Sequence, residues 1–241
     1  MQRTDHGSAD GRPLLLLPGN DLGAPFYAPL AEVIARAGVR VSCLTLPGYL
    51  GELPLATRGW GPLVDAVAPL VDETTILVGH SLGGLLAWLV AARRRVDRLV
   101  LLEPAIPPGR RAAAYAARRY TADVVGGDRN SFVNWSGTFW RVANFDAFPR
   151  WAIEHYEQAR RQSDVATAEA LVRELPDLYP LPSVDVPVHV IRGKRSGWVA
   201  RVNATYLSMK FARVRTSALD GVAHWMANED DEAVAAAILS E

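Results

Sequence analysis

Short apolar runs recur along the chain, and their apolar residues stand at consecutive rather than alternating positions. Such runs favour strands that are buried on both faces, as in a parallel sheet. They lie at 13–17, 39–44, 75–79, 97–102, 186–192 and 213–219. Helical patterns separate the first four runs, at 27–37, 60–71 and 83–94. The alternation predicts an α/β fold of about six strands, all parallel, with helices on both faces of the sheet.

The N-terminal residues leave little room for further strands, because only about a dozen of them precede the first run. After the fourth run the alternation stops. The following segment holds no convincing strand, only helical patterns near 110–125, 131–141, 147–162 and 164–175. We therefore predict a core made of residues 1–106 and 183–241, interrupted by a helical cap insertion at 107–182.

The charged residues balance, with 26 Lys and Arg against 26 Asp and Glu. A chain without excess positive charge has no general attraction for nucleic acid or for an anionic membrane. The one cysteine, Cys43, lies in an apolar run, which favours a buried and inert thiol. No run approaches the roughly 20 apolar residues of a membrane helix, and no apolar signal segment starts the chain. These features predict a cytoplasmic protein without a nucleic-acid or membrane partner.

Ser81 is the candidate nucleophile. It lies in the sequence Gly-His-Ser-Leu-Gly at 79–83, between the strand-like run at 75–79 and a helical pattern. A Gly-x-Ser-x-Gly sequence in this setting is typical of a sharp turn that exposes a serine hydroxyl at the carboxyl end of the sheet. The turn is crowded and needs small neighbours, a requirement that Gly79 and Gly83 meet.

A serine hydroxyl needs a base to remove its proton. His224 follows the last strand-like run and precedes the final helix, which places it at the same end of the sheet as Ser81. We therefore predict that His224 is the base. No two histidines have a spacing typical of metal ligands, and we predict neither a metal nor another cofactor.

Negative charge that develops on a substrate oxygen requires hydrogen-bond donors. The backbone N–H of Leu82, the residue after the nucleophile, is the first candidate. The second is expected from the loop after the first strand, where Gly19 permits a sharp turn. We predict that the N–H of Asn20 fills this role, with Asp21 as the alternative.

The sequences LLLLPGN, LTLPGY, LVGHSLGG, LVLLEP, VPVHVIRG and LDGVAHW occur in this order along the chain. On these motifs the chain resembles the capped, single-domain members of the α/β-hydrolase superfamily over nearly its whole length. The resemblance implies a Ser–His–acid triad and a small-molecule substrate. The resemblance also implies that an epoxide hydrolase or haloalkane dehalogenase of this fold would have Asp where this chain has Ser81, so the serine argues against both activities.

The sequence departs from the family pattern at the third catalytic group. Many members carry an acid in the loop after VIRG, but the matching position here is Ser196, and neither it nor Trp198 is acidic. In a subset of the superfamily the acid ends the strand that here reads DRLVLLE, which points to Glu103. An unpaired carboxylate at the end of an apolar strand would be costly, and a bond to the His224 ring would relieve that cost. Asp220, or no acid at all, are the alternatives.

Two further departures from the family pattern concern the first strand. Pro18 stands where many members have His, and the usual N-terminal hairpin is expected to be missing. In the insertion, by contrast, aromatic residues gather at 132–156. We predict that part of this group lines an apolar pocket over Ser81. The candidate substrate-binding residues are Trp135, Phe139, Trp140 and, outside the insertion, Trp225.

Together these residues predict a serine hydrolase that cleaves a carboxylic ester with an apolar or aromatic acyl group. A thioesterase, a lactonase or a carbon–carbon bond hydrolase would use the same groups. A catalytically inactive ligand-binding protein of the same fold is the alternative from another class.

Overall fold

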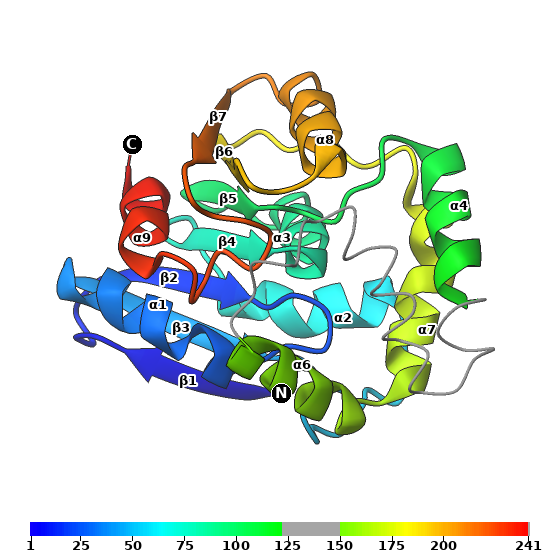
Figure 1. The fold of residues 1–241 in the computed structure, drawn as a ribbon, viewed down its shortest axis with the longest axis horizontal. Helices are drawn as coiled ribbons and strands as arrows, with labels where there is room; N and C mark the ends of the chain where they lie inside the picture. The colour runs from blue at the N-terminus through cyan, green and yellow to red at the C-terminus, as the bar shows by residue number, and fades with distance from the viewer. Residues whose placement is uncertain (122–149, 241) are drawn as a thin grey trace.

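The computed structural model describes residues 1–121 and 150–240. Its strands form one seven-stranded sheet in the order β1-β3-β2-β4-β5-β6-β7 (Figure 1). The strands are β1 Gln2–His6, β2 Arg12–Leu17, β3 Val39–Thr45, β4 Ile76–His80, β5 Arg98–Leu102, β6 Val188–Gly193 and β7 Val214–Leu219. Strands β2 to β7 pair in parallel, as predicted, and each matches one of the six apolar runs within about two residues.

The prediction that all strands are parallel was wrong for β1. This strand pairs antiparallel with β3, with Gln2 opposite Thr45 and His6 opposite Val41. Its five residues are all polar and mostly exposed, so they carry none of the apolar signal on which the prediction relied. A polar strand at the edge gains main-chain hydrogen bonds and also discourages pairing with other sheets. The chain then reverses at Gly7, whose φ is +86°.

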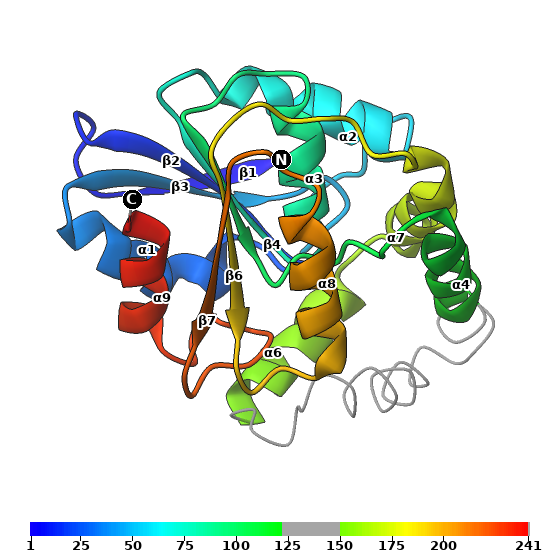
Figure 2. The same ribbon diagram turned by 90° about the horizontal axis from the view of Figure 1, so that it is seen from above.

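Helices cover both faces of the sheet (Figure 2). On one face lie α1 Ala24–Arg36 and α9 Asp231–Leu239, and on the other α2 Trp60–Val67, α3 Leu82–Ala91 and α8 Trp198–Ser208. Within β2, Leu14 and Leu16 pack into the first layer, whereas Leu15 and Leu17 pack into the second. Consecutive apolar residues are therefore needed, because both faces of a central strand are buried.

The described part of the predicted insertion is helical. It contains α4 Arg110–Tyr120, α6 Arg150–Arg161, α7 Val165–Glu174 and a 3₁₀ turn at Leu175–Leu178. Helices α4 and α7 lie side by side at one end of the molecule (Figures 1 and 2). The Trp60 indole N–H donates to the carbonyl of Leu171 at 2.7 Å, which fastens α7 to α2 of the core. The predicted helix at 131–141 lies outside the described residues, and the division into two domains stays a prediction.

Helix α8 begins at Trp198, where a loop was expected. Its N-cap residue is Gly197, whose lack of a side chain removes the usual capping signal. The sequence Lys-Arg-Ser-Gly before it therefore suggested a longer loop.

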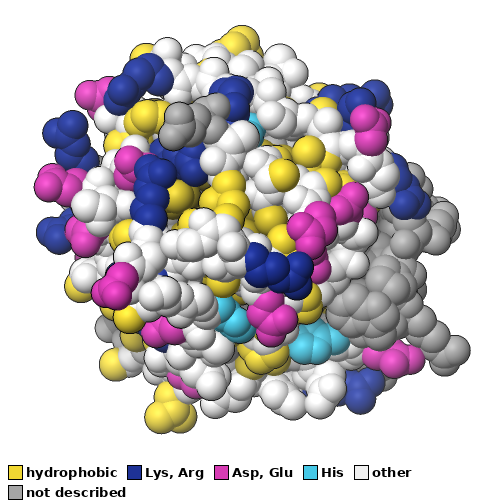
Figure 3. All heavy atoms as spheres, turned by 90° about the vertical axis from the view of Figure 1, so that its left-hand side faces the viewer, with side chains coloured by type: hydrophobic (Ala, Val, Ile, Leu, Met, Phe, Trp, Pro, Cys, Tyr) yellow, Lys and Arg dark blue, Asp and Glu magenta, His cyan; other side chains and the backbone are white. Residues whose placement is uncertain are grey.

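Charged side chains of both signs are interspersed over the face shown in Figure 3, in keeping with the balanced composition. Among the helices of 1–121 and 150–240, none is long and apolar enough to cross a membrane.

Candidate active site

Ser81 occupies a strained turn between β4 and α3. Its φ is +53° and its ψ is −118°, a conformation that side-chain-bearing residues rarely adopt. The end of β5 holds this turn from outside: the Ser81 N–H donates to the Leu102 carbonyl at 2.9 Å, and the Ser81 carbonyl accepts the Ala105 N–H at 2.8 Å. These bonds offset part of the cost of the strained backbone.

Glycines make the turn possible, as their positions predicted. A Cβ at Gly79 would lie 2.2 Å from the Gly83 carbonyl oxygen. A Cβ at Gly83 would lie 2.4 Å from the carbonyl oxygens of both Leu17 and Pro18. The first turn of α3 therefore packs directly on the backbone at the end of β2.

His224 lies beside this serine, at the end of the sheet where it was expected. Its Nε2 is 3.2 Å from the Ser81 Oγ, within hydrogen-bond reach. The histidine stands in the loop between β7 and α9, and its side chain is 12% exposed. The arrangement leaves the Nδ1 edge of the ring facing the end of β5.

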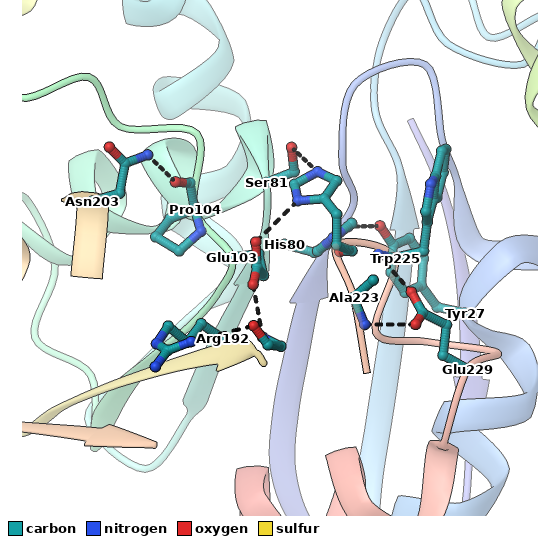
Figure 4. A network of polar contacts seen from close by, with 12 residues as sticks. Tyr27, His80, Ser81, Glu103, Pro104, Arg192, Asn203, Ala223, Trp225 and Glu229 are labelled. Carbon is teal, nitrogen blue, oxygen red and sulfur yellow. Dashed lines mark hydrogen bonds and ion pairs between the residues drawn. The ribbon is translucent and has the colours of Figure 1, made fainter. Parts of the chain in front are cut away.

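Glu103 meets that edge. Its Oε2 is 3.4 Å from the His224 Nδ1, and its side chain is 3% exposed. Its other oxygen, Oε1, accepts the N–H of Gly193 at 2.7 Å (Figure 4). Both carboxylate oxygens therefore have partners, although the backbone φ of Glu103 is unusual at +42°. The loop after β6 lacks the acid of the family pattern. Gly193, the last residue of β6, instead donates its N–H to the Glu103 carboxylate and orients it.

Asp220, the alternative acid, lies in solvent. Its side chain is 86% exposed and pairs with the Lys194 Nζ at 2.8 Å. The carboxylate that faces His224 is thus that of Glu103.

The two predicted oxyanion donors, the N–H groups of Leu82 and Asn20, lie close to Ser81. Asn20 belongs to a tight turn closed by the Leu22 N–H on the Gly19 carbonyl at 3.1 Å. A Cβ on Gly19 would be 3.4 Å from the Ser81 Cβ, so this turn abuts the serine. Within the described ranges, the backbone N–H groups of Asn20 and Leu82 donate to no protein acceptor. Both amides remain available to a substrate oxygen.

Asp21, the alternative donor, serves as a link to α6. Its φ is +59°, and its buried carboxylate lies 3.6 Å from the Nη1 of Arg160. Burial raises the pKa of Asp21, while the arginine opposes that shift. The Asn20 side chain donates to Asp21 at 2.6 Å and accepts the Tyr49 hydroxyl at 3.0 Å. The conformation of this turn is therefore fixed from several sides.

Two residues near the site were missed by the sequence reasoning. The sequence analysis gave His80 no role, but its Nε2 is 2.7 Å from the His224 carbonyl oxygen. The Glu229 carboxylate accepts the N–H of Ala223 at 2.6 Å and that of Trp225 at 3.1 Å (Figure 4). Together they hold the backbone on both sides of the histidine. Burial raises the pKa of Glu229, and the two N–H donors act against that shift.

The predicted substrate-binding residues are only partly described. Trp135, Phe139 and Trp140 lie outside the described residues. Trp225 is 5% exposed and packs against Phe26 and Tyr156, with ring centroids 5.3 and 4.9 Å away. Its ring joins α1 to α6, and its contact with a substrate stays a prediction.

In the part of the chain that the structure describes, no group of three His, Cys, Asp or Glu side chains could hold a metal ion. Cys43 is buried in β3, as predicted, and burial raises the pKa of its thiol to about 12. A cavity of about 430 Å³ lies apart from Ser81, against α4 and α8. It is lined by Gly109, Arg110, Tyr179, Pro180, Leu181, Tyr206 and Lys210.

The comparison with protein families agrees with this architecture. A model of the alpha/beta hydrolase family matches residues 14–237, and the chain belongs to this family.

Named relatives cover only part of the chain. RutD of Variovorax paradoxus, which is named as a candidate carbamate hydrolase, is 30% identical over 173 residues, 68% of this chain and 62% of that protein. The pimeloyl-(acyl-carrier protein) methyl ester esterase of Aromatoleum aromaticum is 37% identical over 95 residues, 37% of this chain and 36% of that protein. The chain thus spans less than two thirds of the length of either relative.

Solved structures share the fold. A candidate epoxide hydrolase from Klebsiella pneumoniae has a TM-score of 0.78 at 21% identity, covering 98% of this chain and 92% of that one. MenH from S. aureus has a TM-score of 0.76 at 16% identity, covering 98% and 96%. At such identities the likeness shows the fold alone.

The close packing of α3 on β2 can be tested by adding one methyl group. Gly83→Ala should lower the free energy of unfolding by about 1–3 kcal/mol, because the new Cβ meets two backbone carbonyls that must shift. Gly61→Ala in α2 is the control, because its Cβ has no atom within 4 Å, and it should leave stability unchanged or raise it by up to about 1 kcal/mol. Denaturant unfolding measures both variants. Equal stability of the two would contradict the packing.

The buried His80 should make stability depend on pH. Burial, and then the neighbouring His224, lower the pKa of His80 from 6.5 to about 3. Between these values the unfolded chain binds a proton that the folded chain excludes, so the free energy of unfolding falls on acidification, by up to about 1.4 kcal/mol per pH unit. Above pH 6.5 this contribution is complete. Unfolding of wild type and His80→Gln from pH 7 to 4 measures it.

The variant should show the shallower slope. His189, whose pKa burial lowers to about 4, acts in the same direction in both proteins and cancels in the comparison. Identical slopes would mean that His80 does not exclude a proton from the fold.

Proposed function

We propose that the protein is a serine hydrolase that cleaves a carboxylic ester with an apolar or aromatic acyl group through an acyl-enzyme on Ser81. One observation carries the proposal: Ser81, His224 and Glu103, from three separate parts of the chain, lie in a continuous line with contacts of 3.2 and 3.4 Å. Membership of the alpha/beta hydrolase family supports it. One relative is named as a methyl ester esterase and another as a candidate carbamate hydrolase, and both names describe acyl-group hydrolysis.

The proposed mechanism starts with the Ser81 Oγ. It attacks the ester carbonyl while the His224 Nε2 accepts its proton, and Glu103 stabilises the imidazolium through the Nδ1–H. The N–H groups of Leu82 and Asn20 bind the oxyanion of the tetrahedral intermediate. His224 then returns the proton to the leaving alkoxide, and the alcohol departs. A water molecule, deprotonated by His224, attacks the acyl-enzyme and releases the carboxylic acid and free Ser81.

Glu103 suits the role of the acid because its geometry is already fixed. With Oε1 held by the Gly193 N–H at 2.7 Å, Oε2 is directed toward the imidazole. A carboxylate that is 3% exposed loses most of its hydration, and these two partners offset that loss. The same group would select the ring tautomer that carries its proton on Nδ1 and leaves Nε2 free to accept.

Serine at position 81 favours acyl chemistry over epoxide opening, since an epoxide hydrolase of this fold is expected to carry Asp there. Thioesters, lactones and carbon–carbon bonds remain candidates, because the same three groups would cleave them. A panel of p-nitrophenyl esters, methyl esters, acyl thioesters, lactones and carbamates separates these classes. We propose a small molecule as the partner and a cytoplasmic location, on the balanced surface charge.

The enzyme and the inactive binding protein differ in the reactivity of Ser81. An activated fluorophosphonate should label the folded protein at this residue, because the reagent requires a deprotonated nucleophile and an oxyanion site. Mass spectrometry of the labelled peptide locates the adduct, and Ser81→Ala should take up no label there. Folded wild type that stays unlabelled would exclude the serine hydrolase.

The identity of the acid can be tested with two amide substitutions. Glu103→Gln should lower kcat by roughly 10² or more, because an amide neither stabilises the imidazolium nor fixes the tautomer. Asp220→Asn is the matched control, since its carboxylate is 86% exposed and paired with Lys194, and it should keep kcat within about twofold.

Ester hydrolysis under saturating substrate measures both variants, and thermal unfolding checks the fold. Near-full activity of Glu103→Gln would mean that Ser81 and His224 act as a dyad, without Glu103 as the acid. Loss of activity in Asp220→Asn alone would move the acid to that residue.

A further inference from the structure

A buried chain of hydrogen bonds connects the oxyanion turn to the candidate base. The N–H of Gly19 donates to the Tyr27 hydroxyl at 2.8 Å. The Tyr27 hydroxyl lies 2.7 Å from the His80 Nδ1, and the His80 Nε2 lies 2.7 Å from the His224 carbonyl oxygen (Figure 4). Tyr27 and His80 are each 1% exposed. Neither side chain has a role in the mechanism above.

The donor at one end, the Gly19 N–H, and the acceptor at the other, the His224 carbonyl, fix the protons of this chain. A carbonyl only accepts, so the His80 Nε2 must carry a hydrogen and donate it to His224. Burial keeps the ring neutral, and its Nδ1 is then an acceptor for the Tyr27 O–H. The Tyr27 oxygen accepts the Gly19 N–H on its remaining lone pair. All the bonds point the same way, which lets each strengthen the next in a site closed to water.

Three loops meet in this chain of bonds. Gly19 begins the turn that carries the Asn20 amide. A Cβ added to Gly19 would lie 3.1 Å from the His80 Nδ1, so this turn packs closely on the His80 ring. His80 precedes Ser81 in the chain and moves with it. Its bond to the His224 carbonyl holds the residue whose own Nε2 is 3.2 Å from the Ser81 Oγ. A single side chain thus fixes the base relative to the nucleophile and, through Tyr27, the oxyanion turn relative to both.

We propose that Tyr27 and His80 are positioning residues, which hold the Asn20 amide and the His224 imidazole in register with Ser81. The inference rests on the proposed function and adds to it a rigid internal link that the triad itself does not contain. The residues act through the backbone of Gly19 and His224, and they do not touch the substrate. Catalysis is sensitive to displacements well below the length of a hydrogen bond, so loosening this link should reduce turnover before it affects binding.

Tyr27→Phe is the direct test, because it removes one hydroxyl and keeps the ring that packs edge-on against Phe26. We expect kcat for the best ester of the panel to fall roughly tenfold, a fraction of the 10²–10³ that loss of a whole oxyanion donor costs. KM should change by less than about twofold, because the lost alignment matters in the transition state.

Tyr179→Phe is the control for the loss of a hydrogen-bonded tyrosine hydroxyl, here a partly buried one. Its hydroxyl donates to the Pro107 carbonyl, outside this chain of bonds. The control should show a fall in melting temperature similar to that of Tyr27→Phe, with kcat unchanged. A kcat of Tyr27→Phe within twofold of wild type, or a loss that Tyr179→Phe shares, would overturn the proposal.

Substitutions of His80 test its two hydrogen bonds separately. Glutamine places an N–H₂ group near the Nε2 position and keeps a donor for the His224 carbonyl, whereas asparagine places an acceptor near Nδ1 and keeps only the partner of Tyr27. Both should retain more activity than His80→Ala. The pH profile of kcat/KM should stay like that of wild type in shape, since His80 exchanges no proton during turnover.

Nitrogen-15 spectra of the histidine rings test the link without any substrate. The His80 ring, assigned by comparison with His80→Gln, should be neutral with its hydrogen on Nε2, and Tyr27→Phe should shift its Nδ1 signal. A charged ring at neutral pH, or hydrogen on Nδ1, would overturn the proposal. Failure of the proposed function is a separate result: wild type would then be inactive on the whole panel and unlabelled at Ser81.

Discussion

The candidate site depends on how closely the first turn of α3 approaches the end of β2. Only glycine fits at position 83, where a Cβ would lie 2.4 Å from two carbonyl oxygens, and this contact sets the position of the strained turn at Ser81. The same contact brings the loop after β2 against the serine, so Ser81 and the Asn20 amide are positioned by the same packing contact. Backbone packed on backbone is stiffer than contacts between long side chains, and it tolerates no small shift. The rest of the site is attached to this fixed point.

Glu103 shows how the fold can accommodate a departure from the family pattern. Moving the carboxylate from the loop after β6 to the end of β5 changes its neighbours in the chain, yet Glu103 still reaches the Nδ1 edge of His224. The end of β6 keeps a part in the site, because Gly193 packs against the Val222 carbonyl and gives its N–H to Glu103. Adjacent parallel strands end at the same edge of the sheet, so a carboxylate on either of two neighbouring strands can face the same imidazole.

Sequence reasoning reached the features that have a strong local signal. Six apolar runs gave the six parallel strands, and the glycines around Ser81 gave the turn and the helix after it. It failed at β1, whose polar residues gain their stability from edge hydrogen bonds rather than from burial. It also missed the bonds that His80 and Glu229 make to backbone groups of the loop around His224. Those bonds join residues whose proximity follows from the tertiary fold, and a backbone acceptor has no signature in the sequence. The contact of Glu103 with His224 could be predicted because a carboxylate at the end of an apolar strand needs a partner.

The polar groups at this end of the sheet stabilise the fold and the geometry of the site with the same bonds. His80 and Glu103 are buried and Glu229 is partly buried, and each would destabilise the protein if its partners were removed. Each has a backbone partner: the His224 carbonyl for His80, the Gly193 N–H for Glu103, and N–H groups of the His224 loop for Glu229. Satisfying these side chains therefore also fixes the backbone around His224. These buried bonds therefore make the backbone rigid around the candidate site. They also make the free energy of unfolding fall when acid protonates His80. Stability and turnover can be separated only by variants that remove one hydrogen bond and leave the packing intact.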